Sequence, residues 1–309
     1  MLLYEENKRY YAFSGYLKQK YSGKVAKISL DAGFTCPNID GTKGVGGCTY
    51  CSGRGSGDFA GDPRLSIREQ FFAVAKRMQE KWASLRYIPY FQAFTNTYAP
   101  VPVLRRLYEE ALSLPDVVGL AIATRADCIS DEAADLLQEL SRRTDLVVEL
   151  GLQSVFDETG ERIHRCHTFA DFLAGFAKLS QRNIPVCVHI INGLPGETPA
   201  MMLHTANTIA RLPLHSVKIH LLHVLRGTKM AEEYERGEFS LLSREDYVQI
   251  VCNQLEVLSP RTVIQRLTGD GKAEDLIGPM WSLKKLVVMN EIDKELRRRN
   301  SWQGKFYTP

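Results

Sequence analysis

The sequence predicts an α/β fold with a parallel sheet, either doubly wound or curled into a partial barrel. Short apolar runs rich in β-branched residues alternate with longer amphipathic stretches. From Tyr90 onward the runs start 28, 28, 40 and 31 residues apart, which is the period of a βα unit. A chain of 309 residues with 44% apolar composition can bury the core that such a fold needs.

Six apolar runs are expected to be buried strands, because each is short, apolar and rich in β-branched residues. Parallel strands present their carboxyl ends at one rim, where functional residues of such folds lie. The predicted architecture is therefore six βα units, as a doubly wound sheet or a partial (β/α)6 barrel, with a site at this rim. The runs are VAKISL from Val25, YFQAF from Tyr90, VGLAIA from Val118, LVVELG from Leu146, VCVHII from Val186 and VKIHLL from Val217.

Amphipathic stretches between these runs predict helices over residues 101–114, 130–143 and 198–212. Two of them open with helix-start signals. Ser130 is a typical N-cap followed by acidic residues, and Thr198 is an N-cap followed by Pro199 at the first helical position. We expect these two helices to begin directly after their caps.

Three parts of the chain are predicted: a basic N-terminal extension over 1–24, a core over 25–242 and a mostly helical C-terminal extension over 243–309 that packs on the barrel. The two ends of the chain are basic. Residues 1–30 carry six Lys or Arg against two Glu, and residues 284–309 carry seven against three acids. Tyrosines such as Tyr10 and Tyr11 stand among the N-terminal lysines, a mixture suited to phosphate contacts and base stacking. A solvated amphipathic helix at each end is the alternative.

The sequence predicts a cytoplasmic protein without a membrane partner. No apolar run approaches the roughly 18 residues that cross a bilayer, and MLLYEENKRYY does not resemble a signal peptide. The seven cysteines would then stay reduced, as metal ligands, catalytic groups or core residues.

The segments that follow the expected strands are polar or glycine-rich. They are TNTYAP (95–100), TRAD (124–127), LQS (152–154) and NGLPGE (192–197). Since these segments share one rim, together they predict a site. Glu149 is a further candidate, because a carboxylate within a buried strand needs a partner or a ligand, and we expect it to face the barrel interior.

Three cysteines, Cys36, Cys48 and Cys51, follow the first expected strand in a loop with eight glycines between Gly41 and Gly61. A structural zinc site usually has four protein ligands, and the nearest histidine in sequence is His164. Three thiolates fit better to an iron–sulfur cluster whose fourth iron is left for another molecule. Glycines let the backbone approach such a cluster closely. A mobile loop with incidental cysteines is the alternative.

A strand followed by this loop and by five more βα units resembles the radical S-adenosylmethionine (radical SAM) superfamily. The usual spacing there is three residues between the first two cysteines, whereas Cys36 and Cys48 are separated by eleven. The long spacer, with FSGYLKQKYSGKVAKISLDAGFTCPN before it and VELGLQS and HIINGLPGE after it, is similar to a small family of bacterial radical SAM proteins. That family is related to the radical SAM domain of the catalytic subunit of Elongator.

The resemblance implies that the three cysteines hold a four-iron, four-sulfur cluster and that S-adenosylmethionine binds its fourth iron. It also implies roles for residues at the rim. Asn96 and Thr97 stand where the superfamily usually has Gly-Gly-Glu, which receives the methionine amino group. The other cofactor-binding candidates are Tyr50 near the adenine or the cluster, Gln153 at the ribose, Arg165 at the methionine carboxylate, His189 at a ribose-binding position, Arg125 and Glu149. Cys166 is a candidate thiyl donor, and the catalytic residues otherwise stay unassigned.

The resemblance further implies reductive cleavage of S-adenosylmethionine to a 5′-deoxyadenosyl radical, with flavodoxin or ferredoxin as electron donor. The relation to Elongator points to the 5-substituent of the wobble uridine of tRNA as the substrate. Two alternatives remain: a radical SAM enzyme that acts on a small molecule or a peptide, and a non-enzymatic iron–sulfur or zinc-binding protein.

Overall fold

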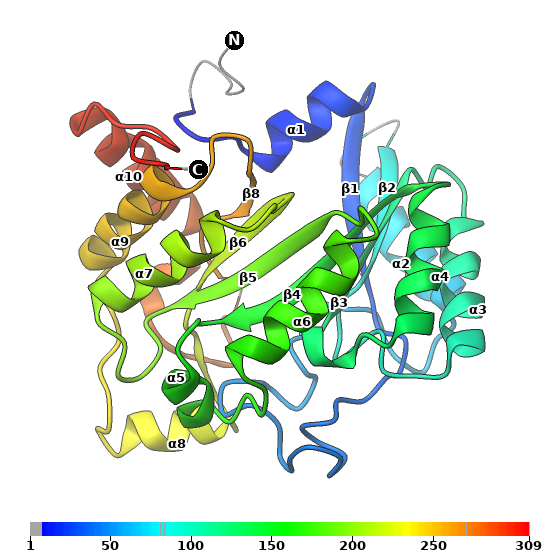
Figure 1. Ribbon diagram of the computed structural model, residues 1–309, viewed down its shortest axis with the longest axis horizontal. Helices are drawn as coiled ribbons and strands as arrows, with labels where there is room; N and C mark the ends of the chain where they lie inside the picture. Colours follow the sequence, from blue (N-terminus) through cyan, green and yellow to red (C-terminus); the bar gives the residue numbers. More distant parts are fainter. Residues whose placement is uncertain (1–7, 81, 83–84, 270, 309) are drawn as a thin grey trace.

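A computed structural model describes residues 8–80, 82, 85–269 and 271–308 of the chain. Its centre is a curled sheet of seven parallel strands in the order β1-β2-β3-β4-β5-β6-β8 (Figure 1). The carboxyl ends of all seven strands therefore lie at one rim, as predicted. The strands are β1 Lys24–Leu30, β2 Leu85–Phe91, β3 Gly119–Thr124, β4 Asp145–Gln153, β5 Val186–Asn192, β6 Ser216–Leu221 and β8 Val263–Arg266.

The second strand begins five residues earlier than the sequence predicted. β2 runs from Leu85 to Phe91, and the rest of the expected run lies in the loop that follows. Pro89 explains the difference, because proline has no N–H for the ladder and argues against a central strand. Accordingly, the ladder between β2 and β3 contains two residues of β2, Tyr90 and Phe91.

The C-terminal extension contributes the seventh strand, one more than predicted. β8 is only four residues long and pairs in parallel with β6. A run this short gives little periodicity, so it could not be separated from its surroundings by sequence alone. A second, two-stranded sheet joins β7 Val224–Leu225 to β9 Leu276–Gly278 in antiparallel fashion.

Most helices pack outside the curled sheet, whereas α1 lies across the opening between the outer strands β1 and β8 (Figure 1). The predicted caps are confirmed, because Ser130 Oγ accepts from the N–H of Ala133 and Thr198 Oγ1 accepts from the N–H of Met201. The helices are α1 Phe13–Lys20, α2 Ile67–Gln79, α3 Val101–Leu112, α4 Asp131–Ser141, α5 Asp157–Arg162, α6 Phe169–Ser180, α7 Pro199–Ala210, α8 Lys229–Glu235, α9 Arg244–Val257 and α10 Lys285–Arg298. No helix in the described ranges is long and apolar enough to cross a membrane.

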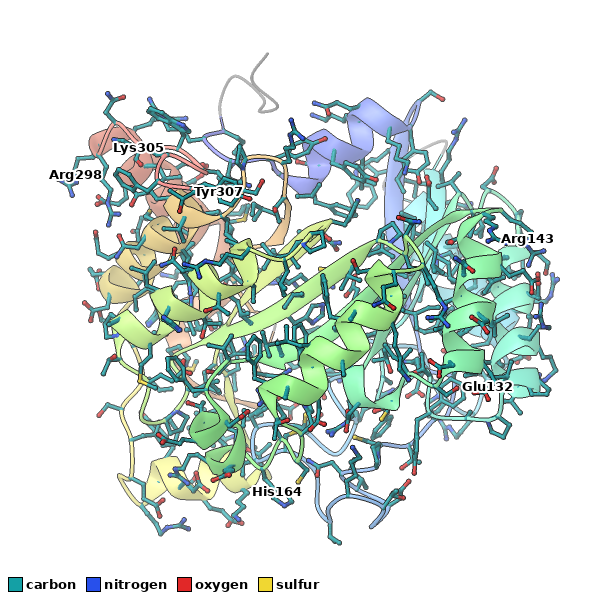
Figure 2. All side chains as sticks on the ribbon, viewed as in Figure 1. Glu132, Arg143, His164, Arg298, Lys305 and Tyr307 are labelled. Atoms are coloured by element: carbon teal, nitrogen blue, oxygen red, sulfur yellow. The ribbon has the colours of Figure 1, made fainter. Side chains whose placement is uncertain are left out.

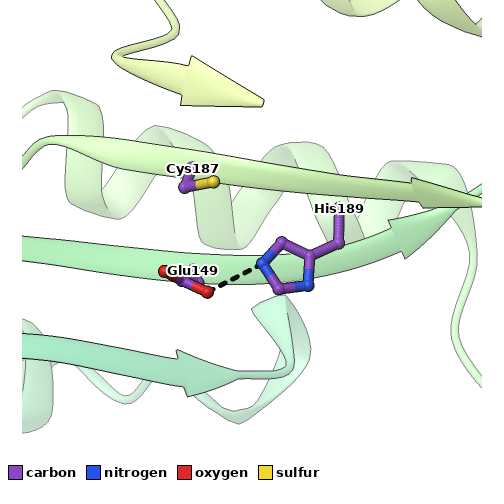
Figure 3. A group of neighbouring side chains, drawn as sticks. All are labelled: Glu149, Cys187 and His189. Atoms are coloured by element: carbon purple, nitrogen blue, oxygen red, sulfur yellow. Dashed lines mark hydrogen bonds and ion pairs between the residues drawn. The ribbon is translucent and has the colours of Figure 1, made fainter. Parts of the chain in front are cut away.

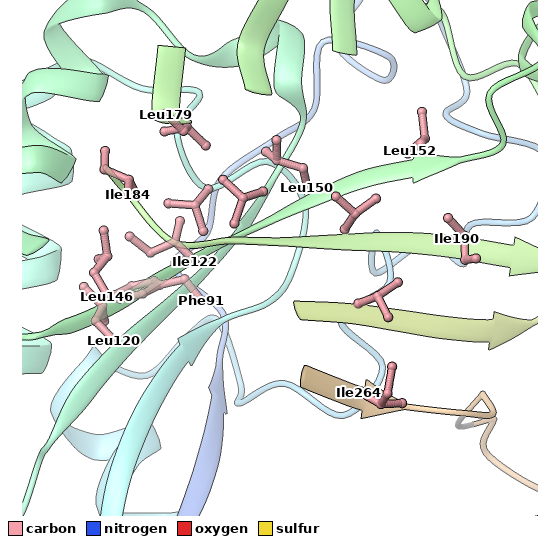
Figure 4. Close-up of a cluster of buried hydrophobic side chains, with 14 of the residues drawn as sticks. Phe91, Leu120, Ile122, Leu146, Leu150, Leu152, Leu179, Ile184, Ile190 and Ile264 are labelled. Atoms are coloured by element: carbon pink, nitrogen blue, oxygen red, sulfur yellow. The ribbon is translucent and has the colours of Figure 1, made fainter. Parts of the chain in front are cut away.

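The main hydrophobic core lies between the strands and these helices. Figure 4 shows Leu120, Ile122 and Leu150 on neighbouring strands together with Leu179 of α6, and all four side chains are fully buried. Removing apolar surface from water in this layer is what holds the helices on the sheet. The opposite face of the sheet is therefore left to line the interior of the barrel.

Gly175 in α6 lies against the backbone of Ala126, which follows β3 at the rim. A Cβ atom at this position would lie 2.1 Å from the carbonyl oxygen of Ala126. We expect Gly175→Ala to lower the free energy of unfolding by about 1–3 kcal/mol, because backbone must shift to admit the methyl group. Urea denaturation measures the change. Gly53→Ala is the control, since nothing lies within 4 Å of its added Cβ, and an equal loss there would contradict the packing argument.

The two ends of the described chain lie side by side. The N–H of Gln303 donates to the carbonyl of Arg9, Tyr11 donates its N–H to Gln303 Oε1, and Ile264 of β8 donates to the carbonyl of Tyr11. Tyr10 and Tyr11 are buried, so the prediction that they offer free rings for base stacking is wrong. Figure 2 places Arg298 and Lys305 at this end of the molecule, far from His164 near the cysteine loop.

Candidate active site

One large cavity occupies the interior of the curled sheet. Its volume is about 1210 Å³, and it runs from the N-terminal segment around Phe13 to the loop that carries Cys36, Cys48 and Cys51. A pocket for a drug-sized ligand typically takes about 300–1,000 Å³, so this cavity has room for more than one small molecule. Of the residues predicted for the site, Tyr50, Arg125, Glu149, Gln153, Arg165 and His189 line it together with the three cysteines.

Backbone hydrogen bonds fix the cysteine loop to the rim. The N–H of Thr49 donates to the carbonyl of Ile163, and the N–H of Met230 donates to the carbonyl of Thr49. The side chain of Asn38 adds a bond from its Nδ2 to the carbonyl of His164, at 2.5 Å. These bonds tie the loop to segments far away in sequence, so the fold itself holds the loop in place.

The eleven-residue spacer between the first two cysteines packs against the segment after α5. A Cβ atom at Gly44 would lie 2.4 Å from Asn38 Oδ1 and 3.0 Å from the sulfur of Cys166. The ring of His164 also hydrogen-bonds the carbonyl of Gly47 through Nδ1, at 2.9 Å. The spacer is therefore an ordered part of the site. Cys166 contacts it from outside and is not among the residues that line the cavity.

The three thiol sulfurs of the loop do not all lie within 4.8 Å of one another. Among the described residues, the group of His, Cys, Asp and Glu whose ligand atoms all lie within 4.8 Å of one another is Glu149, Cys187 and His189, and it contains none of them. Cys48 and Cys51 share a hydrogen bond, so the third sulfur, that of Cys36, is the one that stands apart. Three soft thiol donors in one loop fit an iron–sulfur cluster.

Neighbouring groups prepare Cys48 to be a thiolate. A hydrogen bond from Cys51 lowers the pKa of Cys48 to about 6 against the effect of burial, with further help from the charge of Arg125 and from Asn38. Asn38 Nδ2 lies 3.5 Å from the sulfur. The same interaction with Cys48 raises the pKa of Cys51. Hydrogen-bond donors around sulfur ligands are the usual means by which a protein tunes a cluster.

Arg125 connects the third strand to the cysteine loop. Its guanidinium donates to Asp127, to the carbonyl of Arg165 at 2.9 Å and to that of Cys166 at 3.3 Å. Asp127 in turn accepts from Lys43 of the spacer, at 2.6 Å. Burial disfavours the charged form of Arg125. The hydrogen bond and the negative charge of Asp127 outweigh this effect and raise the pKa of Arg125 above its ordinary value. Arg125 is thus a fixed cation beside the thiols.

Several residues at the rim adopt positive φ angles, which are unfavourable for residues other than glycine. Phe94, Gln153, His164 and Cys166 have φ values of +58°, +64°, +54° and +57°. At Gln153 the pairing of β4 with β5 shifts register, so its side chain turns into the cavity instead of continuing the strand pattern. Strained backbone of this kind concentrates at functional sites because the surrounding structure holds it there.

Arg165 is fully buried and hydrogen-bonds mainly to the protein backbone. Its Nε donates to the carbonyl of His167 at 2.9 Å, and its Nη1 donates to the carbonyls of Leu152 and Ser154 at 2.6 Å each. Asp157 lies 3.3 Å from Nη2. Burial lowers the pKa of Arg165. The structure thus places Arg165 as a clamp between the end of β4 and the segment after α5, at the cavity wall.

We expect Arg165→Lys to destabilise the fold, because an ammonium group cannot satisfy three carbonyls in a fixed fork. Each buried carbonyl left without a donor costs about 1–3 kcal/mol. Urea denaturation measures the loss, with Arg162→Lys as the control. Arg162 is partly exposed and makes ion pairs with Glu233 and Glu238 that lysine can keep. Equal midpoints for the two variants would contradict the clamp.

Asn96 and Thr97 lie outside the lining of the cavity. Asn96 Nδ2 donates to the carbonyls of Phe91, Ala93 and Ala123, and its buried Oδ1 has no partner. Thr97 Oγ1 is bonded to Thr124 Oγ1 and to a backbone carbonyl. Both side chains therefore support the loop after β2, while Thr95 and Thr124 reach the cavity itself.

Glu149 faces the barrel interior and has three partners. It lies 2.6 Å from Lys27 Nζ of β1 and 2.9 Å from His189 Nε2 of β5, and it also pairs with Lys218 of β6. Figure 3 shows His189 turned toward the carboxylate, with Cys187 on the same strand. Burial alone would favour the neutral acid, but Lys218 and Lys27 hold the pKa of Glu149 well below its ordinary value.

These contacts argue against a metal ion at Glu149, Cys187 and His189. Two ammonium groups already neutralise the carboxylate, and burial raises the pKa of Cys187 to about 12, so its thiol stays protonated. Metal ligands must be deprotonated. Glu149 was predicted from the sequence as a site residue, whereas Lys27 and Lys218 were not. Each of these two lysines stands between apolar residues of an expected strand, and this position could have marked it as a buried charge.

The fold and the cysteine loop define a class of protein: partial barrels that carry a three-cysteine loop after the first strand. Comparison with known proteins supports this class. The model of the radical SAM superfamily matches residues 41–209, more than half of the chain, and that of the Radical_SAM C-terminal domain matches residues 214–298. The chain belongs to the radical SAM superfamily, as its sequence predicted.

Individual relatives agree. Protein YtqA of Bacillus subtilis is 52% identical over 97% of this chain and 93% of its own length. A tRNA uridine(34) acetyltransferase of Methanocaldococcus infernus is 28% identical over 50% of this chain and 29% of its own length. The structure of the archaeal Methanocaldococcus infernus Elp3 with an N-terminal deletion has the same fold, with a TM-score of 0.70 and 18% identity. The matched region covers 92% of this chain and 65% of that one.

Proposed function

We propose that the chain is a radical SAM enzyme that modifies the wobble uridine of tRNA in the cytoplasm. The observation that carries the reaction type is the set of three thiols, Cys36, Cys48 and Cys51, which line one cavity at the rim of the sheet. A four-iron, four-sulfur cluster would be held by these residues. Membership of the superfamily supports the same assignment.

When bound, such a cluster supplies one electron to S-adenosylmethionine, and the carbon radical formed on cleavage takes a hydrogen atom from the substrate. The chain's own residues bind and orient. Tyr50 packs beside the thiols, Gln153 projects into the cavity from its strained turn, and His189 is oriented by its bond to Glu149.

Two features support tRNA as the substrate. One is the likeness of half of the chain to a tRNA uridine(34) acetyltransferase. The other is the charge of the cavity. Its described lining has eight cations and two acids, which suits a ligand that carries phosphate. The acids are Asp58 and Glu149, and the cations are Lys18, Lys24, Lys27, Arg125, Arg165, Lys218, Arg266 and Lys285.

Two measurements test the proposal. The chain is reconstituted with iron and sulfide, reduced with dithionite and assayed for 5′-deoxyadenosine from S-adenosylmethionine. Product formation is expected, and its absence would contradict the reaction type. Second, nucleosides of tRNA are compared between cells with and without the gene. Altered wobble uridines are expected, whereas an unaltered set together with 5′-deoxyadenosine formation would point to a small molecule or a peptide as the substrate.

A further inference from the structure

The spacer between the first two cysteines, residues 37–47, forms a compact turn that positions Asn38. The carbonyl of Pro37 accepts from the N–H of Gly44, and the carbonyl of Asn38 accepts from the N–H of Gly47. The side chain of Asn38 is fully buried. Because these backbone bonds close the spacer on itself, the fold fixes the place from which the Asn38 side chain starts.

The two hydrogens of the Asn38 amide have two acceptors. Nδ2 lies 2.5 Å from the carbonyl oxygen of His164 and 3.5 Å from the sulfur of Cys48. An amide nitrogen carries two hydrogens, so each acceptor receives one of them. The Asn38 amide therefore connects the segment after α5 to the second cysteine of the loop.

The same contacts determine which way the Asn38 amide points. Turning it over would bring Oδ1 to the carbonyl oxygen of His164 and to the sulfur of Cys48, and these acceptors would then face one another without a hydrogen. In the observed orientation Oδ1 is buried and has no hydrogen-bond partner among the described residues. A buried acceptor without a partner costs free energy, which the two bonds of Nδ2 offset.

Gly44 leaves the space in which the Asn38 amide sits. A Cβ atom at Gly44 would lie 2.4 Å from Asn38 Oδ1. The φ angle of Gly44 lies outside the left-handed region, so its backbone angle does not require glycine. The close approach of the amide is the reason for glycine at this position. A methyl group here would displace the amide and change the distance from Nδ2 to the sulfur.

Cys48 differs from the other two cysteines in having this donor. Among the described residues, Asn38 is the side-chain amide that donates to a thiol of the loop. Cys51 instead contacts the hydroxyl of Ser56 at 3.5 Å, an exposed contact in which either atom can be the donor. A hydroxyl hydrogen can rotate away, whereas the second bond of the Asn38 amide holds its hydrogens in place.

We propose that Asn38 raises the reduction potential of the cluster through its hydrogen bond to Cys48, and that the spacer serves to hold this donor in place. The inference rests on the proposed function, because it requires a cluster on the three thiols. An N–H group directed at a sulfur ligand favours the form with more negative charge, which is the reduced form. Asn38 is thus a positioning residue that makes the cluster easier to reduce by one electron.

Asn38→Leu tests the hydrogen bond, because leucine has nearly the shape of asparagine and no donor. The full chain and the variant are reconstituted with iron and sulfide, and their midpoint potentials are measured by reductive titration followed by electron paramagnetic resonance. We expect the same iron content in both and a more negative midpoint potential in the variant. An unchanged potential at full iron content would overturn the proposal.

Two further variants of the spacer separate the hydrogen bond from general packing. Thr42→Val is the matched control, because it removes an exposed 2.8 Å contact between Thr42 Oγ1 and the hydroxyl of Tyr98. We expect the wild-type potential for this variant. Gly44→Ala keeps Asn38 but displaces its amide, and its potential is expected to shift in the same direction as that of Asn38→Leu. An equal shift in Thr42→Val would show that any loosening of the spacer suffices, and it would overturn the proposal.

A spectroscopic measurement on the wild-type chain does not depend on the folding of a variant. The chain is labelled with nitrogen-15 in its asparagine side chains, and the reduced cluster is studied by pulsed electron paramagnetic resonance. We expect a magnetic coupling between the cluster and an asparagine nitrogen that is missing in Asn38→Leu. Absence of such a coupling in the wild type would overturn the proposal.

The failure of this inference is distinguishable from that of the proposed function. A shifted potential in Asn38→Leu together with no 5′-deoxyadenosine from the wild type would contradict the proposed reaction and leave the role of Asn38 in place. Formation of 5′-deoxyadenosine together with an unchanged potential would contradict the role of Asn38 alone. A wild-type chain that takes up no iron would overturn both, and its iron content shows this directly.

Discussion

Replacing Cys36, Cys48 or Cys51 singly with alanine is expected to abolish both iron retention and 5′-deoxyadenosine formation. All three thiols line the cavity, and each would hold a different iron of one cluster, so two remaining thiolates cannot keep it. This prediction is checked by measuring the iron and sulfide content after reconstitution together with 5′-deoxyadenosine formation. We expect product below detection in all three variants.

Cys128→Ala is the matched control for this series. Cys128 follows the third strand, and its side chain is not among those that line the cavity. Burial raises the pKa of its thiol to about 12, so it is a poor metal ligand. Full iron content is expected here, with an unchanged circular dichroism spectrum in all four proteins. Iron retained at wild-type level by Cys36→Ala would refute the ligand assignment.

Removing the charge of Glu149 is expected to have the largest effect on stability. Glu149→Gln leaves Lys27 and Lys218 facing each other in the barrel interior without a counter-charge. Breaking a buried ion pair in this way costs about 3–5 kcal/mol. Urea denaturation at neutral pH measures the loss. Adding Lys218→Met to the variant is expected to restore part of it, because the repulsion between the ammonium groups is removed.

The same carboxylate predicts how stability depends on pH. The pKa of Glu149 lies well below its ordinary value of 4.5, so its contribution is complete above about pH 4.5 and is lost as the pH falls further. Glu149→Gln should therefore flatten the acid limb of the stability curve. Glu139→Gln is the control, because Glu139 pairs with Arg105 on the surface. An acid limb unchanged by Glu149→Gln would show that other groups determine it.

Much of the fold could be predicted because local signals agree with it. Apolar β-branched runs gave five of the six predicted strands almost to the residue, and Ser130 and Thr198 marked helix starts through caps that depend on their neighbours alone. The start of β2 was predicted too late, because Pro89 argues against a central strand at that position. β8 was not predicted, because a run of four residues is too short to show hydrophobic periodicity. These are the positions where tertiary contacts override a local pattern.

The site was predictable to a lesser degree. Cysteines in a regular spacing are visible in the sequence, but the partners of a buried charge are not. Glu149 meets Lys27 across 122 positions and Lys218 across 69, and only the curl of the sheet brings them together. Tyr10 shows the reverse error, since it stands in a basic segment and is nevertheless buried against the C-terminal part of the chain. Sequence spacing cannot show such long-range packing.

The contact between Tyr11 and β8 has a consequence for how the protein tolerates shortening. A sheet that curls without closing leaves an outer strand with unused backbone groups, and such edges promote aggregation. Here the N-terminal segment covers that edge, because Ile264 donates to the carbonyl of Tyr11 and Ala12 forms a bridge with Ile264. The same segment walls the cavity through Phe13. Trimming the chain to residue 14 would therefore cost solubility and ligand retention in a single step, and the two properties cannot be engineered separately at this end.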